Sequence, residues 1–242
     1  MVLFRGESSV DEIQQRFDGD VERFSNLETG QSAAIDAPLA LDLVTRAALS
    51  VTPKPTRVLD LGCGAGNFTM RLLGRCDTVK EVTFVDLSLP MLERAQQRAQ
   101  QDRSIEVRTL QGDLRTAKFE DCQYDVILAG AVLHHLRSDE EWEQVVSRIF
   151  ACTSPGGSFW IFDLIAHQHS AIQAMMWERY GEYLIQLKGP EYRDEVFAYA
   201  TKEDSPRPLP WQLQQLTRAG FDVEVLHART CFAAFGGIRL AR

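Results

Sequence analysis

The sequence predicts an α/β protein built on a doubly wound, mostly parallel seven-stranded sheet. From Thr56 onward, short apolar runs alternate with helical stretches, and the runs are almost continuously apolar, as strands covered on both faces are. A glycine-rich turn directly follows the first run, which is typical of sheets that bind ligands at the carboxyl ends of their strands. Two runs follow the last predicted helix, so we expect a hairpin-like edge with one antiparallel strand near the carboxyl terminus.

Residues 1–52 are expected to form an amino-terminal helical cap of two helices with a polar joint. Apolar residues recur at helical spacing up to Phe24, and the stretch 26–31 then breaks the pattern. A second amphipathic helix is predicted over Ala34–Leu49, before the prolines at positions 53 and 55. Such a cap often covers a substrate pocket, although its apolar stripe is first of all a packing face.

Residues 53–164 are expected to form the core of the domain. Its predicted strands are Arg57–Leu61, Glu81–Asp86, Ile105–Gln111, Tyr124–Ala129 and Ser158–Leu164. Its predicted helices are Asn67–Gly74, Leu89–Gln101 and Asp139–Cys152. This alternation indicates parallel strands with helices on both faces of the sheet.

Residues 165–204 are too long for a simple crossover and are rich in aromatic residues and methionine. We expect them to form a helical insertion that lies over the pocket mouth as a lid. Residues 205–242 are expected to supply the last helix, Trp211–Arg218, which Gly220 stops, and two strands that begin at Val223 and Thr230. The whole chain, 1–242, is thus expected to be a single domain.

Composition narrows the classes of function. No apolar run approaches the roughly 18 residues that a spanning helix needs, and the amino terminus lacks a signal-peptide profile, so a cytoplasmic protein without a membrane partner is expected. The net charge of −8 disfavours nucleic acid as a partner. The cysteines are scattered and never form a C-x-x-C pair, which indicates reduced thiols; they are Cys63, Cys76, Cys122, Cys152 and Cys231.

The glycine-rich turn Gly62-Cys63-Gly64-Ala65-Gly66 ends the first strand and opens a helix, so its backbone can approach a ligand closely. Asp86 ends the second strand about 20 residues further on, where a carboxylate can accept hydrogen bonds from both hydroxyls of a ribose. Asn67 stands where the dinucleotide fingerprint has its third glycine, which argues against NAD. A purely structural role for the glycines is the alternative.

Five segments in this order resemble the motifs of class I, Rossmann-like, S-adenosylmethionine-dependent methyltransferases. They are Asp60–Gly66, Val85–Leu92, Gln111–Leu114, Tyr124–Leu136 and Ser154–Phe159. The resemblance implies S-adenosyl-L-methionine as cofactor, S-adenosyl-L-homocysteine as product, and a cofactor-binding role for the core.

The same resemblance implies roles for individual residues. The backbone of Gly62, Cys63 and Gly64 would pass the methionine moiety, while Asp60 would orient the turn or the ammonium group through water. The remaining expected cofactor contacts are Asp86 to the ribose, Asp113 to the adenine amino group, Leu87 and Leu114 to the two ring faces, Met91 as a wall or as core, and Ala129 through its backbone.

His134 and His135 follow the fourth strand, where the methyl-accepting atom should lie. Either histidine could act catalytically by taking a proton from a hydroxyl, amine or thiol, or could only hold the loop. No metal is expected, because His167 and His169 lack partnered acids at ligand spacing.

We therefore expect methyl transfer to a small-molecule acceptor by a monomer or homodimer, since the aromatic insertion offers pocket walls and few clustered cations. The carboxyl-terminal stretch distantly resembles the carboxy-S-adenosylmethionine synthases of transfer-RNA wobble-uridine modification, in which case Arg193 or Arg207 could bind a carboxylate. A non-catalytic module that binds an adenosyl ligand is the other alternative.

Overall fold

The computed structural model describes residues 4–5, 7–19, 21–26, 32–101, 104–118 and 123–241. Its centre is a seven-stranded sheet of order β3-β2-β1-β4-β5-β7-β6. The strands are β1 (Arg57–Leu61), β2 (Glu81–Asp86), β3 (Glu106–Gln111), β4 (Tyr124–Gly130), β5 (Thr153–Leu164), β6 (Asp222–Arg229) and β7 (Phe232–Ile238). Only β7 runs antiparallel to its neighbours, so the predicted fold class and the antiparallel strand are confirmed.

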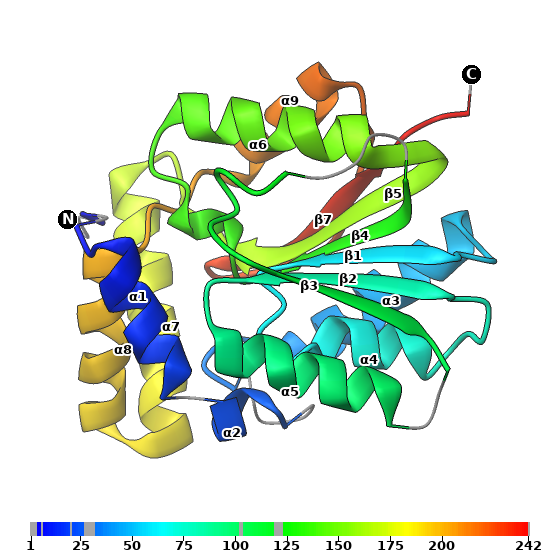
Figure 1. The fold of residues 1–242 in the computed structure, drawn as a ribbon. Helices are drawn as coiled ribbons and strands as arrows, with labels where there is room; N and C mark the ends of the chain where they lie inside the picture. Colours follow the sequence, from blue (N-terminus) through cyan, green and yellow to red (C-terminus); the bar gives the residue numbers. More distant parts are fainter. Residues whose placement is uncertain are drawn as a thin grey trace.

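Helices cover both faces of the sheet (Figure 1). One face carries α3 (Ala37–Val51), α4 (Asn67–Leu73) and α5 (Leu89–Gln100), and the other carries α6 (Asp139–Cys152) and α9 (Leu209–Ala219). Ser88 and Ser138 start α5 and α6 by accepting hydrogen bonds from Met91 N–H and Glu141 N–H.

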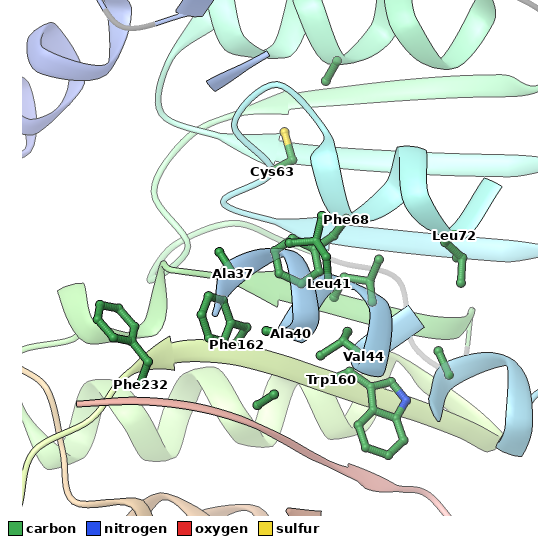
Figure 2. Close-up of a cluster of buried hydrophobic side chains, with 14 of the residues drawn as sticks. Ala37, Ala40, Leu41, Val44, Cys63, Phe68, Leu72, Trp160, Phe162 and Phe232 are labelled. Carbon is green, nitrogen blue, oxygen red and sulfur yellow. The ribbon is translucent and has the colours of Figure 1, made fainter. Parts of the chain in front are cut away.

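The core on the α3 side forms because α3 is unusually apolar and its small residues let it lie close to β5. Ala40 and Val44 of α3 are fully buried and lie beside Trp160 and Phe162 of β5, as Figure 2 shows. The indole N–H of Trp160 is buried but hydrogen-bonded, because Nε1–H donates to Ser158 Oγ at 2.9 Å. This packing holds α3 against the sheet that carries the site.

A second group of helices lies beside the carboxyl ends of the parallel strands (Figure 1). It comprises α1 (Val10–Asp18), α7 (Ser170–Lys188) and α8 (Pro190–Glu203), while α2 (Val21–Phe24) lies near α5. Trp177 of α7 stacks on Phe197 of α8 with ring centroids 4.5 Å apart. Arg16 of α1 forms a bidentate pair with Glu203 at the end of α8, at 2.7–3.2 Å. The amino-terminal cap and the insertion are therefore joined.

Several predicted boundaries are wrong. The second amino-terminal helix begins at Ala37, not Ala34, because Asp36 takes a left-handed conformation with φ 61°. Thr230 belongs to the turn between β6 and β7, with φ 51°, rather than to a strand. Strand β5 begins at Thr153, before the predicted Ser158, with a register shift against β4. The insertion is two helices, because Gly189 with φ 94° turns the chain.

Cys63, Cys76, Cys152 and Cys231 are free thiols, as expected. Cys122 and most of the predicted polar joint, residues 27–31, lie outside the described residues. No helix in the described ranges has the length and apolar character required to cross a bilayer.

Candidate functional site

The candidate site is a cavity at the carboxyl ends of β1, β2 and β4, beneath α1, α7 and α8. The strand order reverses between β1 and β4, which pair with Leu61 beside Ala129, and such a switch point leaves a crevice above the sheet. Most of the predicted cofactor residues line this cavity, namely Gly62, Cys63, Gly64, Asp86, Leu87, Met91, Asp113 and Leu114. His134 and His135 line it as well.

The two glycines of the β1–α4 loop have different reasons to be glycine. Both have left-handed backbones, with φ 58° at Gly62 and 49° at Gly64. A Cβ on Gly62 would overlap the side chain of Val132, whereas a Cβ on Gly64 would have no neighbour within 4 Å. Gly62 is thus required for packing, and Gly64 presents bare backbone to the cavity.

Asp86 is held in place at the end of β2 by backbone donors. Its Oδ2 accepts from Gly64 N–H at 2.8 Å, and its Oδ1 accepts from Ser88 N–H at 2.9 Å. Burial raises the pKa of this carboxyl above its ordinary value, against the lowering effect of these hydrogen bonds. Each oxygen keeps a further lone pair for a ligand hydroxyl.

Asp113 lies after β3 and is paired with Arg115, a partner that the sequence reasoning missed. Arg115 donates its backbone N–H to Asp113 Oδ1 at 2.8 Å and its Nε–H at 3.0 Å. Burial opposes ionisation of Asp113, but the hydrogen bonds and charge of Arg115 outweigh it, so the pKa of Asp113 lies below its usual range. An acid followed two residues later by arginine is the signal that could have found this pair.

Asp60 and Ala129 do not line the cavity, unlike the other predicted cofactor residues. Asp60 is 1 % exposed and accepts a hydrogen bond from Thr69 Oγ1 at 2.7 Å, so it ties β1 to α4 beneath the loop. Burial raises the pKa of Asp60 to about 7. Ala129 is fully buried, and the next residues, Gly130 and Ala131, form the cavity wall instead.

His134 lies in the short 3₁₀ helix η1 (Leu133–His135) and is oriented by Asp163 of β5, another residue that sequence reasoning missed. The imidazole Nδ1 is hydrogen-bonded to Asp163 Oδ1, and Leu133 N–H donates to Asp163 Oδ2 at 2.7 Å. Burial opposes protonation of His134, but the carboxylates of Asp163 and Asp204 outweigh it and raise its pKa to about 9.

Asp204, directly after α8, completes this part of the site. Its side chain is 6 % exposed, and its Oδ1 lies 3.5 Å from His134 Nε2 and 3.5 Å from His135 Nδ1. Burial raises the pKa of Asp204 to about 7. Burial also lowers the pKa of His135, as do the charges of His134 and Arg16. His135 therefore favours the neutral imidazole, and His134 the protonated one.

Other residues named from the sequence lie elsewhere. Arg193 pairs with Asp194, and Arg207 lies 3.0 Å from Asp139 Oδ1; neither lines the cavity. His167 Nε2 is 2.8 Å from the carbonyl oxygen of Thr230, which places it at the β6–β7 turn. Neither arginine is thus placed at the cavity, and the hypothesis that one of them binds a carboxylate stays a prediction.

Comparison with known proteins agrees with this geometry. Residues 58–157 match the family model described as a methyltransferase domain. An uncharacterised methyltransferase of Mycobacterium tuberculosis is 36% identical over 101 residues, which are 42% of this chain and 47% of that protein. Trans-aconitate 2-methyltransferase of Variovorax paradoxus is 38% identical over 118 residues, 49% of this chain and 41% of the relative. The chain thus spans about half the length of these curated relatives.

Among solved structures, the DhpI-SAM-HEP complex has a TM-score of 0.62 at 17% identity and covers 94% of this chain and 96% of its own. This likeness, taken alone, supports only the fold. Together with the family match over 58–157 and the ordered motifs, it shows that the chain is similar to class I, Rossmann-like methyltransferases.

Proposed function

We propose that this protein transfers a methyl group from S-adenosyl-L-methionine to a small-molecule acceptor. The observation that carries the proposal is the contact between Gly64 and Asp86, which puts bare backbone and a fixed carboxylate together at one end of the cavity. The same cavity continues to His134, where an acceptor would lie. The predicted roles of the residues that line the cavity, for the cofactor and for catalysis, remain part of this proposal.

The residues at the end of the cavity that holds Gly64 and Asp86, called the loop end from here on, fit the cofactor. The open side of Gly64 leaves room for the methionine chain, and Asp86 can accept from the ribose hydroxyls. Leu87, Met91 and Leu114 supply apolar walls for the adenine, beside the carboxylate of Asp113. S-adenosylmethionine would supply a methyl group that is already activated on a sulfonium, so the protein needs chiefly to align the acceptor and exclude water.

The opposite end of the cavity favours a small and partly apolar acceptor. This end is lined by aromatic residues and by the buried Asp204; the aromatic residues are Phe17 of α1, Trp177 and Tyr180 of α7, and Tyr199 of α8. Aromatic walls with a few polar groups are usual for small-molecule sites. The names of two relatives, trans-aconitate 2-methyltransferase and demethylmenaquinone methyltransferase, support a small-molecule acceptor. The cytoplasmic location and the monomeric or homodimeric state stay predictions.

Titration calorimetry of S-adenosylmethionine against the wild type and Asp86→Ala tests the proposal. Loss of a charged hydrogen-bond partner costs about 1.5–3 kcal/mol, so the variant should bind about tenfold to a hundredfold more weakly. Asp77→Ala, at an exposed position outside the cavity, is the matched control and should bind like the wild type. Equal affinity in wild type and Asp86→Ala would contradict the site.

Mass spectrometry of the reaction products then separates the enzymatic alternatives. Incubation with candidate acceptors should yield S-adenosylhomocysteine together with an acceptor heavier by one methyl group. A heavier, carboxylated cofactor would instead indicate carboxy-S-adenosylmethionine synthesis. Binding without any product across the acceptor panel would favour the non-catalytic module.

A further inference from the structure

A buried His-His-Asp cluster lies in the cavity, away from the glycine loop. The carboxylate of Asp204 is 6 % exposed and lies between His134 Nε2 and His135 Nδ1, at 3.5 Å from each. The three ligand-type atoms all lie within 4.8 Å of one another. Among the described residues, the buried Nδ1 of His135 has no hydrogen-bond partner. A buried polar atom without a partner is costly, so something absent from the polypeptide should satisfy this group.

We propose that His134, His135 and Asp204 bind a first-row divalent transition-metal ion, with Zn²⁺ as the reference ion. Metal–ligand bonds of about 2.1 Å at tetrahedral angles place two ligand atoms about 3.4 Å apart. Both 3.5 Å separations from Asp204 Oδ1 match this spacing, and the two histidine nitrogens lie within 4.8 Å of each other. Two imidazoles and one carboxylate are also a donor set that suits such ions.

The residues behind His134 support a ligand role. Its Nδ1 is taken by Asp163, so Nε2 is the nitrogen that faces Asp204 and the cavity. Asp163 is 1 % exposed and fixed by Leu133 N–H and Leu164 N–H, both at 2.7 Å. Metal-binding histidines usually donate their other N–H to such a carboxylate, which fixes the tautomer and the orientation of the ring.

The charges around the cluster favour a cation. Asp163 and Asp204 contribute two negative charges, while Arg16 and Glu203 offset each other in their bidentate pair. Arg137 also lines the cavity, with its guanidinium bonded to the carbonyl oxygen of Ser8. Arg137 offsets one of the two carboxylates, so with neutral histidines the cluster keeps a net negative charge that favours a bound cation.

The role of the ion rests on the proposed function. A three-residue ligand set leaves at least one coordination position open, and these residues line the cavity. An acceptor hydroxyl or thiol bound there would release its proton to solvent, because a bound cation lowers its pKa. Its anion would then form a bond to the methyl carbon as the carbon–sulfur bond of the cofactor breaks and the electron pair returns to sulfur.

Direct metal binding to the full chain tests the inference. Protein freed of metal with a chelator is titrated with Zn²⁺ by calorimetry, and Co²⁺ is used as a spectroscopic probe whose visible absorption reports tetrahedral coordination. We expect one ion per chain. His135→Asn and Asp204→Asn should bind Zn²⁺ at least about tenfold more weakly, and Asp163→Asn about tenfold to a hundredfold.

His169→Asn is the matched control, because His169 is exposed at the start of α7 and only accepts a hydrogen bond from Ala171 N–H, which asparagine can also do. It should bind Zn²⁺ like the wild type. S-adenosylmethionine binding, measured without metal, verifies that each variant is folded and tests the proposed function separately. Absence of stoichiometric Zn²⁺ binding by the wild type, or unchanged binding by Asp204→Asn, would overturn the metal site.

Discussion

The paired substitutions Gly62→Ala and Gly64→Ala should separate folding from ligand binding within one loop. Both place an L side chain in a left-handed backbone, which costs about 1–2 kcal/mol. Only the alanine at position 62 also collides with Val132, and overpacking adds about 1–3 kcal/mol. We therefore expect Gly62→Ala to lose about 2–5 kcal/mol of unfolding free energy and Gly64→Ala only about 1–2 kcal/mol.

Urea unfolding without ligand measures the stability difference, and calorimetry with S-adenosylmethionine measures binding. Gly64→Ala should fold yet bind the cofactor more weakly, since its methyl group enters space that the cavity leaves open. Val132→Ala in the Gly62→Ala background should recover part of the lost stability, because it removes two of the overlapping carbons. Equal losses of stability in both glycine variants, or full cofactor affinity in Gly64→Ala, would refute the division of roles.

Two further substitutions test the buried carboxyl group of Asp60 and the packing of α7 against α8. Asp60→Asn should stabilise the protein increasingly as pH rises from 3.8 to about 7, because the folded state holds the Asp60 proton more tightly than the unfolded chain and loses this advantage on deprotonation. The gain in unfolding free energy has an upper bound of about 4 kcal/mol. A difference between variant and wild type in urea unfolding that does not change with pH would contradict this prediction. Trp177→Ala removes a side chain that stacks on Phe197 and should cost about 3–5 kcal/mol by the same measurement, whereas an unchanged midpoint would mean that α7 and α8 are not held by this stack.

The loop end of the site could be predicted because its signals are local. Gly62, Gly64 and Asp86 sit at the ends of neighbouring parallel strands, and the alternation of strands and helices already places those ends together. The glycine pattern and the acid therefore predict both which residues line the cavity and which ligand class they suit. Asp60 and Ala129 are the exceptions, because the carboxylate of Asp60 accepts a hydrogen bond from Thr69 and Ala129 is fully buried.

The other end depends on contacts between segments that no local pattern joins. Asp204 reaches the histidine pair only because α7 and α8 form a hairpin, and Gly189 determines where that hairpin turns. Asp163 could be recognised in principle, since an acid near the end of the strand beside β4 must lie close to the residues that follow β4. The sequence does not predict the proposed metal site, because Asp204 is separated from His134 by α6, β5, α7 and α8.

The two ends of the cavity are thus built by different means, and this determines how each can be tested. At the loop end the backbone is the recognition element: left-handed residues gather there, and Ala131 with φ 54° continues the series after β4. Added side-chain carbon is the perturbation that this end should tolerate least. At the acidic end, around Asp204, the proposed roles belong to side chains, and isosteric changes such as Asp204→Asn remove charge while keeping volume. We therefore expect added side-chain carbon at the loop end to weaken cofactor binding. An isosteric change at the acidic end should leave cofactor binding intact and affect only the acceptor.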